Sequence, residues 1–592
     1  MTTRDTIYSV DASCTSKQHL SVLGEGVTQL PPESDGSGNV EYKTKLNPAN
    51  SLVPIYDQRA NMTNMSHTVM PSRLAEGNGH AVYVLGVHDD GEVVGISDVE
   101  LQLTIQTLEN MTRQLDNVQI LSIDRRRLDA QKDQMVAEVH ITQRNIVRRT
   151  ELRVTVLGDH GAGKSTILGC LTYGEADDGR GKARLNLLRH RHEVESGRTS
   201  SITLGTIGFD AEGLVLNYAN NRSAEQIFQR SRHVVTFVDT CGYAKHLKTT
   251  ASAIVGHSPH VFCLVLAADV AAITTTTREY LRIAAVLCVP LMIVVTKMDA
   301  AIKPQFAAMM HELMSALDTV VPGRGKCIVT SKTDSNSLAN DMMGLAVVPI
   351  FTTSAVRSVG FSELTAVLAK SRHSHSGSVL ATTAKNGKTK ARKNLFEFHI
   401  EHVFSIDTVG KVVTGWVKAG TIEVGPKSAR RLVIGPNALG GFDDVDVTSI
   451  HALRIPSESA QADSSAALAI QPQKPITVRK GMVVVDADCL DKDTKRVSAE
   501  FIARIAVLDP ELKAMNSVIV HIRSTYRLAR ILDISNETTD DGNNHQSGEF
   551  GNWATIRLKF DDGVCDFLYA GMPIIARDGQ RLTFVGHVSD VV

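Results

Sequence analysis

The sequence lacks the features that mark secreted, membrane-spanning or metal-stapled proteins. Its eight cysteines are scattered and none forms a Cys-x-x-Cys pair, so neither a zinc site nor a disulfide framework is predicted, and a cytoplasmic location is expected. Residues 1–30 hold no apolar stretch of a secretory signal, and the best apolar runs, 261–268 and 287–296, are too short to span a bilayer. No membrane contact is therefore expected.

The sequence also lacks an excess of charge of either sign. The 63 basic and 64 acidic residues leave a formal net charge of −1, so any contact with nucleic acid must come from a local patch. The hydrophobic content of 43% over 592 residues is typical of a globular protein with roughly four domains. A monomer is expected.

The order of composition and periodicity along the chain predicts its domains. Residues 1–30 carry few large apolar residues and are expected to be flexible. Turn-forming residues at 89–91 predict a hairpin with strands over 80–87 and 92–96, and Ser97 or Asp98 is the expected N-cap of a helix that runs to about residue 115. With the strand-like runs that follow, these elements predict a small α+β domain over 31–150. A Ser/Thr/Lys-rich basic linker is predicted over 371–395, where a solvated segment and an RNA-contacting segment are both open interpretations.

Between these segments, over 151–370, near-continuous apolar strands alternate with helices. This pattern predicts an α/β domain with a mostly parallel sheet, whose ligands bind at the carboxyl ends of the strands. The predicted strands are 152–157, 233–238, 261–268, 291–296 and 347–353.

Beyond the linker, short strands alternate with Gly and Asp turns and predict β-barrels over 396–492 and 493–592. Arg523, Arg527 and Arg530 on the second barrel are either a basic edge for tRNA or ordinary strand-surface charge.

One motif points directly to phosphate chemistry. A Gly-x-x-x-x-Gly-Lys-Ser pattern follows the apolar run 152–157 and opens a helix, so that backbone N–H groups can converge on phosphate oxygens. Lys164 is expected to reach the β- and γ-phosphates, and the Ser165 hydroxyl to ligate Mg²⁺. The residues of this phosphate loop are Gly158, Asp159, His160, Gly161, Ala162, Gly163, Lys164 and Ser165.

Further motifs follow three other strands. Asp239 and Gly242, in Asp-Thr-Cys-Gly after 233–238, fit an arrangement in which the carboxylate holds Mg²⁺ through water and the glycine N–H senses the γ-phosphate. Thr199 lies between the two phosphate motifs. It is either a surface threonine or a Mg²⁺ ligand present only with GTP, which would make the segment a switch.

The last two motifs predict the base. Asp299, in Thr296-Lys297-Met298-Asp299, can accept hydrogen bonds from guanine N1–H and N2–H₂, whereas adenine lacks the exocyclic donor. The Lys297 stem can cover one face of the base. The backbone of Ser354 and Ala355 can contact guanine O6. Four elements in this order favour GTP and GDP over adenine nucleotides.

Together these motifs resemble the translational GTPase superfamily of elongation factor Tu and elongation factor 1-alpha. The segments Gly179-Arg180-Gly181, 189–193, 195–201 and Gly208-Phe209-Asp210 are similar to the effector region of the GTP-binding protein 1 and GTP-binding protein 2 group. The resemblance spans nearly the whole chain. It implies a GTPase domain followed by two barrels, a phosphate loop from Gly158 to Thr166, Mg²⁺ bound by Ser165 and Thr199, and a role in translation or mRNA turnover.

Two departures from the superfamily pattern bear on catalysis. Related factors place a histidine directly after the Asp-x-x-Gly motif to orient water, whereas this chain has Tyr243. A phenol can donate a hydrogen bond but is a poor base at neutral pH, so slow intrinsic hydrolysis is predicted. His160, unusual at its loop position, either supplies the missing imidazole or points to solvent. Thr296 replaces the more common asparagine, so nucleotide affinity is expected to be lower.

Three functions are compatible with these residues. The first is a GTP hydrolase whose switch gates binding to the ribosome, aminoacyl-tRNA or other RNA. The second is a GTP-dependent RNA- or protein-binding adaptor with little hydrolysis, which Tyr243 favours slightly. The third is a metabolic GTPase of the sulfate-assimilation type, although no residue of the sequence points to its substrate.

Overall fold

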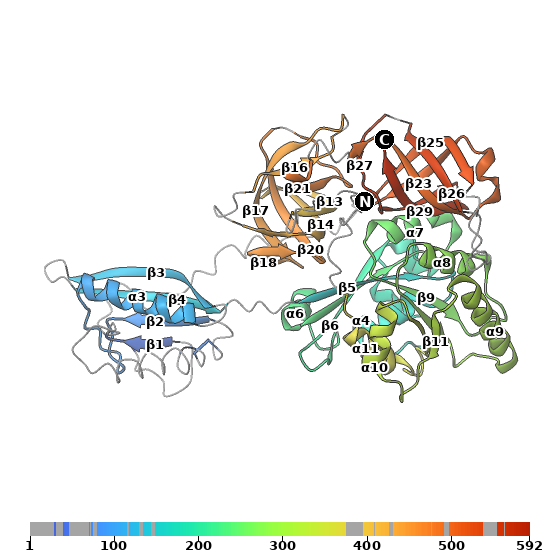
Figure 1. Cartoon of the computed structure of the whole chain (residues 1–592). Coiled ribbons are helices and arrows are strands. Elements are labelled where there is room, and N and C mark those ends of the chain that lie inside the picture. Colours follow the sequence, from blue (N-terminus) through green and yellow to red (C-terminus); the bar gives the residue numbers. More distant parts are fainter. Residues whose placement is uncertain are drawn as a thin grey trace, which may run out of the picture. The chain divides into compact units, whose positions relative to one another are not determined.

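The computed structural model of the 592-residue chain separates into two compact units, Met1–Val147 and Arg148–Val592 (Figure 1). The residues that the structure describes are 29–30, 40–45, 70, 73–74, 80–114, 118–129, 134–143, 149–373, 395–407, 409–424, 430–437, 439–474, 476–490, 496–536, 553–561, 563–579 and 581–592. Most of the predicted flexible segment 1–30 and of the predicted linker 371–395 lies outside this range. Among the described residues, no helix is both long and apolar enough to cross a membrane.

The N-terminal unit contains a four-stranded sheet with the order β1-β2-β4-β3 and a helix, α3, packed against it. The bounds are β1 Val40–Lys43, β2 His80–Leu85, α3 Asp98–Gln114, β3 Val118–Asp129 and β4 Gln134–Gln143. Helix α3 begins where the sequence predicts, because Ser97 and Glu100 exchange reciprocal capping hydrogen bonds. The expected second hairpin strand at 92–96 forms only isolated bridges. Gly95 there has a φ of +74°, which a continuing strand does not allow.

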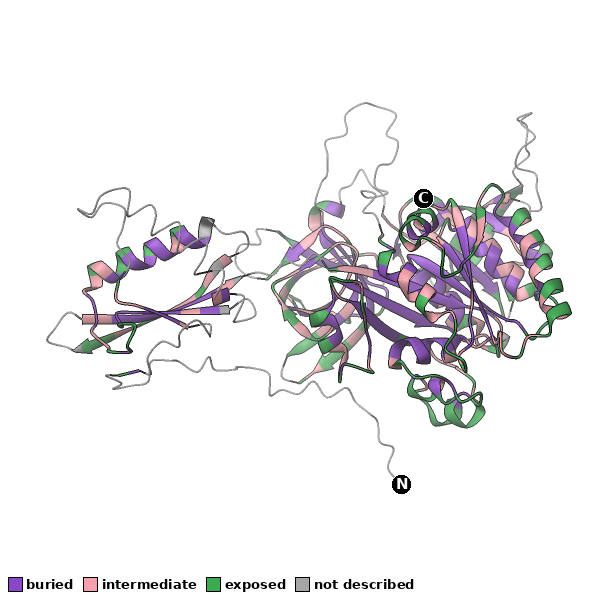
Figure 2. Cartoon of the chain, turned by 90° about the horizontal axis from the view of Figure 1, so that it is seen from below, coloured by how far each residue is buried: buried purple, intermediate pink, exposed green. Residues whose placement is uncertain are grey.

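The second unit is built on an eight-stranded sheet with the order β11-β12-β10-β9-β5-β8-β6-β7. Six strands are parallel, whereas β6 and β7 form an antiparallel edge. The central strands are buried along their whole length, which explains their continuous apolar sequences (Figure 2). The bounds are β5 Thr150–Leu157, β6 Thr203–Phe209, β7 Val215–Leu216, β8 His233–Asp239, β9 Val261–Ala267, β10 Leu291–Thr296, β11 Gly325–Ile328 and β12 Val347–Thr352.

Helices cover both faces of this sheet. Helices α7, α8 and α9 pack on one face, and α4, α10 and α11 pack on the other. Their bounds, with those of the shorter helices, are α4 Lys164–Tyr173, η3 Ala183–Asn186, α5 Arg191–Ser196, α6 Ala224–Arg230, η4 Ala244–His246, α7 Leu247–Gly256, α8 Thr275–Val286, α9 Lys303–Val320, α10 Ser335–Met343 and α11 Phe361–Lys370. The predicted fold class of a phosphate-loop α/β domain is confirmed.

A first β-rich region follows the α/β region. Its main sheet has the order β16-β21-β13-β14-β20-β17-β18, and an additional pairing of β16 with β17 joins its first strand to its sixth. Phe396, Phe398 and Ile400 belong to its apolar core. The bounds are β13 Glu397–Ile406, β14 Gly410–Ala419, β15 Thr421–Glu423, β16 Leu432–Gly435, β17 Asp443–Ala452, β18 Ile455–Ser457, β19 Ser459–Gln461, β20 Ser464–Pro472, β21 Val483–Asp486 and η5 Ala487–Leu490.

The C-terminal region is a closed six-stranded barrel with the order β23-β26-β25-β24-β28-β29. Alternate residues of each strand fill its interior, as the predicted period of two requires. The bounds are β22 Val497–Ser498, β23 Glu500–Val507, η6 Pro510–Ala514, β24 Ser517–Ile522, β25 Thr525–Asn536, β26 Trp553–Phe560, β27 Asp566–Phe567, β28 Pro573–Asp578 and β29 Arg581–Val591.

The three arginines considered as a basic edge are paired with acids of the same barrel. Arg523 and Arg527 both contact the buried carboxylate of Asp566, and Arg530 lies 2.6 Å from Asp561. The structure therefore favours strand-surface charge over an RNA-binding edge at this place, because each of the three guanidiniums already contacts a carboxylate and Arg523 is buried.

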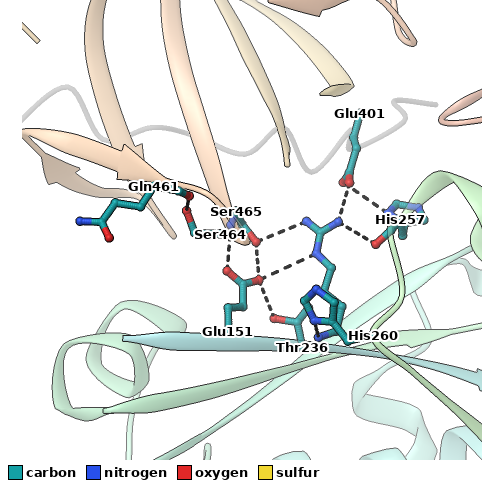
Figure 3. A network of polar contacts seen from close by, with 9 residues as sticks. Glu151, Thr236, His257, His260, Glu401, Gln461, Ser464 and Ser465 are labelled. Atoms are coloured by element: carbon teal, nitrogen blue, oxygen red, sulfur yellow. Dashed lines mark hydrogen bonds and ion pairs between the residues drawn. The ribbon is translucent and has the colours of Figure 1, made fainter. Parts of the chain in front are cut away.

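A buried polar network attaches the first β-rich region to strand β5 (Figure 3). The Arg153 guanidinium donates to a carboxylate oxygen of Glu401 at 2.5 Å and to the His257 carbonyl oxygen at 2.9 Å, and it lies 4.1 Å from the centre of the Trp416 ring. Glu151 accepts a hydrogen bond from the Ser465 backbone N–H at 2.8 Å. Burial raises the pKa of Glu401, but Arg153 and His257 outweigh it and hold that pKa well below its usual range.

Candidate nucleotide site

The phosphate loop connects β5 to α4. Gly158, Gly161 and Gly163 have φ values of +140°, +77° and +93°, which only glycine adopts readily. A side chain on Gly158 would also run into the Val265 carbonyl oxygen of the neighbouring strand. This backbone therefore depends on glycine at the position where the sequence pattern places it.

Lys164, the first residue of α4, is buried and folds back over the loop. Its ammonium group donates to the carbonyl oxygens of Gly158 at 2.9 Å and Asp159 at 2.8 Å. Burial lowers the pKa of Lys164, while the nearby Asp239 acts against this. The lysine is thus held beside the loop N–H groups, as a phosphate site requires.

Three oxygen-bearing side chains meet at the start of α4. The Ser165 hydroxyl donates to one carboxylate oxygen of Asp239 at 2.6 Å and lies 2.9 Å from the Thr199 hydroxyl. The second Asp239 oxygen is buried and has no hydrogen-bond partner among the described residues. Burial raises the pKa of Asp239 to about 6, because an anion with an unpaired oxygen in a dry site is costly.

This donor set fits a small hard cation. Two hydroxyls and a carboxylate are the oxygen ligands that Mg²⁺ takes in protein sites. A cation beside Asp239 would pair its orphaned oxygen. The sequence-predicted metal ligands are therefore brought together, although they lie on three separate elements of the chain.

The segment that carries Thr199 is fixed by one buried carboxylate. Glu193, in α5, accepts from the backbone N–H groups of Ser200 at 2.7 Å and Ser201 at 3.0 Å, and from both serine hydroxyls. Its other oxygen accepts from the backbone N–H groups of Arg189 and His190. Burial raises the pKa of Glu193, but these hydrogen bonds outweigh it and hold the pKa at about 2.

The Asp-x-x-Gly loop touches this segment directly. The Cys241 thiol donates to the Thr199 carbonyl oxygen at 2.6 Å, and the Thr250 hydroxyl donates to the Cys241 carbonyl oxygen at 2.7 Å. Gly242 faces Lys164 so closely that a side chain there would collide with the ammonium group. The Thr199 segment, the Asp-x-x-Gly loop and the first turn of α7 therefore form one connected unit.

Tyr243 and His160 face each other at the open side of the loop. Their ring centroids are 6.1 Å apart in an edge-to-face arrangement, and Tyr243 is 42% exposed. Burial lowers the pKa of His160, and nearby Arg198, Lys164 and Arg184 lower it further. At neutral pH the imidazole is therefore uncharged and can accept a hydrogen bond.

The base-recognition motifs lie at the ends of β10 and β12. The Asp299 carboxylate accepts from the Ser354 hydroxyl at 2.5 Å, and Lys297, with a φ of +57°, reaches Asp269 at 2.9 Å. The Ala355 carbonyl oxygen accepts from the Asp177 N–H at 3.0 Å. The structure thus gathers the predicted base site at one edge of the sheet.

Thr296, which the sequence motif places in the base site, faces the phosphate loop. Its hydroxyl donates to the Ala162 carbonyl oxygen at 2.7 Å and lies 3.2 Å from the Leu266 carbonyl oxygen. Thr296 therefore links the base-recognition strand to the phosphate loop. The remaining loop residue, Thr166, is partly buried within α4.

Several residues of the site were not identified from the sequence. Glu193 lies within the segment similar to an effector region, but nothing in that pattern reveals that its carboxylate is buried. Asp177 caps the backbone N–H groups of Gly179, Gly181 and Ala183. A carboxylate two residues before Gly179 was a detectable signal for this turn.

Comparisons with known proteins agree with this geometry. The Elongation factor Tu GTP binding domain family matches residues 149–374. Fold and site together define a phosphate-loop GTPase of the translation-factor type.

Two relatives that match most of the chain identify the group within this class. GTP-binding protein 2 of Homo sapiens is 32% identical over 573 residues, which cover 95% of this chain and 88% of that protein. GTP-binding protein 1 of Xenopus laevis is 31% identical over 534 residues, covering 88% and 75%. The chain therefore belongs to the GTP-binding protein 1 and GTP-binding protein 2 group of the translational GTPase superfamily, and it is a GTP-binding, translation-factor-like protein.

Solved structures resemble the chain at lower identity. Translation elongation factor SelB from Methanococcus maripaludis, in complex with the GTP analogue GppNHp, is 18% identical, covers 74% of this chain and 79% of its own, and gives a TM-score of 0.47. The GTP-bound Ski7 GTPase-like domain of S. cerevisiae is 14% identical, covers 74% and 97%, and gives a TM-score of 0.49.

Proposed function

We propose that this protein is a GTP-hydrolysing switch that acts on the ribosome with aminoacyl-tRNA, or in linked mRNA turnover, and that its intrinsic hydrolysis is slow. The observation that carries the proposal is the meeting of Ser165, Thr199 and Asp239 at one point. Thr199 reaches this point only because its segment is ordered, so occupancy of the site and order of the segment are linked.

The roles of the residues follow from their positions. Ser165 and Thr199 would hold Mg²⁺ through their hydroxyls, and Asp239 would hold it through water. When bound, Mg²⁺ would neutralise charge on the β- and γ-phosphates. Lys164 and the loop N–H groups would bind the phosphates, and Asp299 would select guanine by accepting from its N–H groups.

Hydrolysis requires a water molecule in line with the γ-phosphate. Tyr243 and the neutral His160 face each other beside Gly242 and are the side chains placed to orient it. Neither is a strong base at neutral pH, so they contribute mainly by positioning the water. This supports slow turnover that a partner could accelerate.

GTP turnover with and without ribosomes, together with GTP-dependent binding of aminoacyl-tRNA, tests the proposal. We expect low intrinsic turnover, stimulation by ribosomes, and loss of both in Thr199→Ala with GDP binding retained. Equal turnover with and without ribosomes would refute the ribosomal role.

A second candidate function is a GTP-dependent RNA- or protein-binding adaptor with little hydrolysis. The observation that favours it is Tyr243 in place of a histidine. The adaptor predicts partner binding that depends on GTP, with no turnover above background even on ribosomes. The His160→Ala and Tyr243→Phe variants separate the roles of the two side chains, since an unchanged rate in His160→Ala excludes the imidazole.

A further inference from the structure

Two arginines approach the nucleotide site without an acidic partner. Arg198 directly precedes Thr199, and its guanidinium carbon lies 5.6 Å from the centre of the Tyr243 ring. Arg184, in η3, has a buried Nε that makes no hydrogen bond to any described residue. None of the ion pairs among the described residues includes either arginine. Both positive charges are therefore available to an anion.

Arg184 packs beneath the backbone that leads to Arg198. One of its Nη atoms lies 2.6 Å from the position that a side chain on Gly197 would occupy, and its Nε lies equally close to that position on Gly181. Gly197 has a φ of +64°. The guanidinium of Arg184 thus packs against the backbone at both glycines and supports the turn from which Arg198 projects.

The two arginines and Lys164 all influence the same side chain, that of His160. All three cations, Arg198, Lys164 and Arg184, lower the pKa of His160, so all three lie close to one imidazole beside the phosphate loop. Asp239 and Asp159 act against the charge of Lys164, whereas neither arginine forms an ion pair with a described acid, so unpaired positive charge remains beside the loop. A triphosphate is the ligand class that would compensate it.

We propose that Arg198 is a catalytic residue of the GTPase reaction, acting in cis on the transferring phosphoryl group, and that Arg184 is a positioning residue that holds its turn. The inference rests on the proposed hydrolysis. In that step a water oxygen bonds to the γ-phosphorus while the bond to the β–γ bridging oxygen breaks. GDP leaves with the electron pair, and the water proton ends on phosphate. The guanidinium stabilises the charge that develops on the γ- and bridging oxygens.

This role explains the tyrosine at 243. In the nucleotide-free protein the guanidinium rests against an aromatic face, which attracts a cation only weakly at an exposed site. A protonated imidazole at the same position would repel the guanidinium instead. Tyr243 therefore provides a resting place from which Arg198 can move to phosphate oxygens, where its hydrogen bonds are charge-assisted.

Single-turnover hydrolysis tests the proposal in Arg198→Ala, Arg198→Lys and, as a matched control, Arg191→Ala. Arg191 lies in the same segment, its side chain is 92% exposed, and among the described residues it pairs only with Glu195. We expect the hydrolysis rate of Arg198→Ala to fall by about 100-fold or more, with less than fivefold change in the Kd for GTPγS. Arg198→Lys should recover little, and added guanidinium ions should partly rescue Arg198→Ala. Hydrolysis within twofold of the parent would overturn the proposal.

A second measurement keeps the inference separate from the proposed function. If the parent protein itself shows no hydrolysis, that function fails, but binding of GDP with aluminium fluoride still reports on transition-state recognition. Loss of this binding in Arg198→Ala, with GDP binding intact, supports the catalytic role of Arg198. Equal binding by the variant and the parent protein refutes that role. Arg184→Ala should slow the reaction, and the double variant with Arg198→Ala should be no slower than Arg198→Ala alone. If the double variant were slower than Arg198→Ala by the full effect of Arg184→Ala, the positioning role of Arg184 would be excluded.

Discussion

Replacing Glu193 by glutamine should loosen the segment that carries Thr199 while leaving the fold intact. One carboxylate oxygen accepts four hydrogen bonds from Ser200 and Ser201, and the other accepts two from the backbone N–H groups of Arg189 and His190. A glutamine can place an acceptor at only one of these positions. In its better orientation the amide NH₂ faces the backbone N–H groups of Arg189 and His190, which then lose their acceptor.

The magnitude follows from these two lost bonds. A donor left unsatisfied costs about 1–3 kcal/mol when it is buried and less where water reaches it, so losing these two part-buried bonds should cost the ordered segment about 2 kcal/mol or more. Because about 1.4 kcal/mol is a factor of ten, its population relative to open forms should fall by roughly 30-fold or more. The effect should not vary between pH 6 and 8. The folded pKa of about 2 lies below the ordinary value, so the stabilisation is complete above the ordinary value and is lost only as the pH falls through about 2.

Amide hydrogen exchange with a non-hydrolysable GTP analogue bound measures this loss. The amides of Ser200 and Ser201 should exchange much faster in Glu193→Gln. Glu195→Gln is the matched control, because Glu195 lies on the same helix but is exposed and pairs only with Arg191. Equal protection in the two variants, or an effect that titrates near pH 7, would refute the reasoning.

Three further predictions concern other parts of the site and its attachment. Burial raises the pKa of Asp239 to about 6, so Asp239 should release a proton when Mg²⁺ binds below that pH. The apparent Mg²⁺ affinity of the GDP-bound protein should therefore weaken about tenfold per pH unit below about 6. Calorimetry in buffers of different ionisation enthalpy counts the released proton, and Asp239→Asn should release none. Thr296→Ala removes the hydroxyl that joins β10 to the phosphate loop, so the Kd for GDP should rise about fivefold or more in fluorescence titration, whereas an unchanged Kd would show that the link is dispensable. Glu401→Gln removes the nearer of the two carboxylates beside the buried Arg153, while Glu151 stays 3.9 Å from its Nε, and should destabilise the α/β domain and its attached β-rich region by about 3 kcal/mol in urea unfolding. Glu423→Gln, at an exposed position, should cost little, and equal effects of the two would argue against the network.

The site motifs could be located from the sequence because each follows a strand. The apolar run before Gly158 and the buried strand before Asp239 fix where the chain leaves the sheet, and parallel strands bring those exits to one edge. The edge strands β6 and β7 were not predicted, since β6 contains two glycines and pairs only on the side of β8 along most of its length. Its shape depends on tertiary contacts that local propensity does not record.

Burial and pairing were harder to predict than position. Glu193 is a charged residue in a polar segment, which is typical of a solvated helix, yet it is fully buried. Arg523 and Arg527 have the pattern of a basic surface, but both are paired with the buried carboxylate of Asp566, some forty residues away. These partners are distant in the sequence, so residue type and spacing could not reveal them.

Strand β5 gives the protein a path for mechanical load. Its first half carries Glu151 and Arg153, which form hydrogen bonds with the first β-rich region, and its carboxyl end leads into Gly158. Gly158 follows Arg153 by five residue steps of extended chain, about 17 Å. Hydrogen bonds to neighbouring strands on both sides keep β5 from stretching. A partner that pulls or twists this region would therefore strain the backbone that cradles the phosphates, and so would change how long the nucleotide stays bound without touching it.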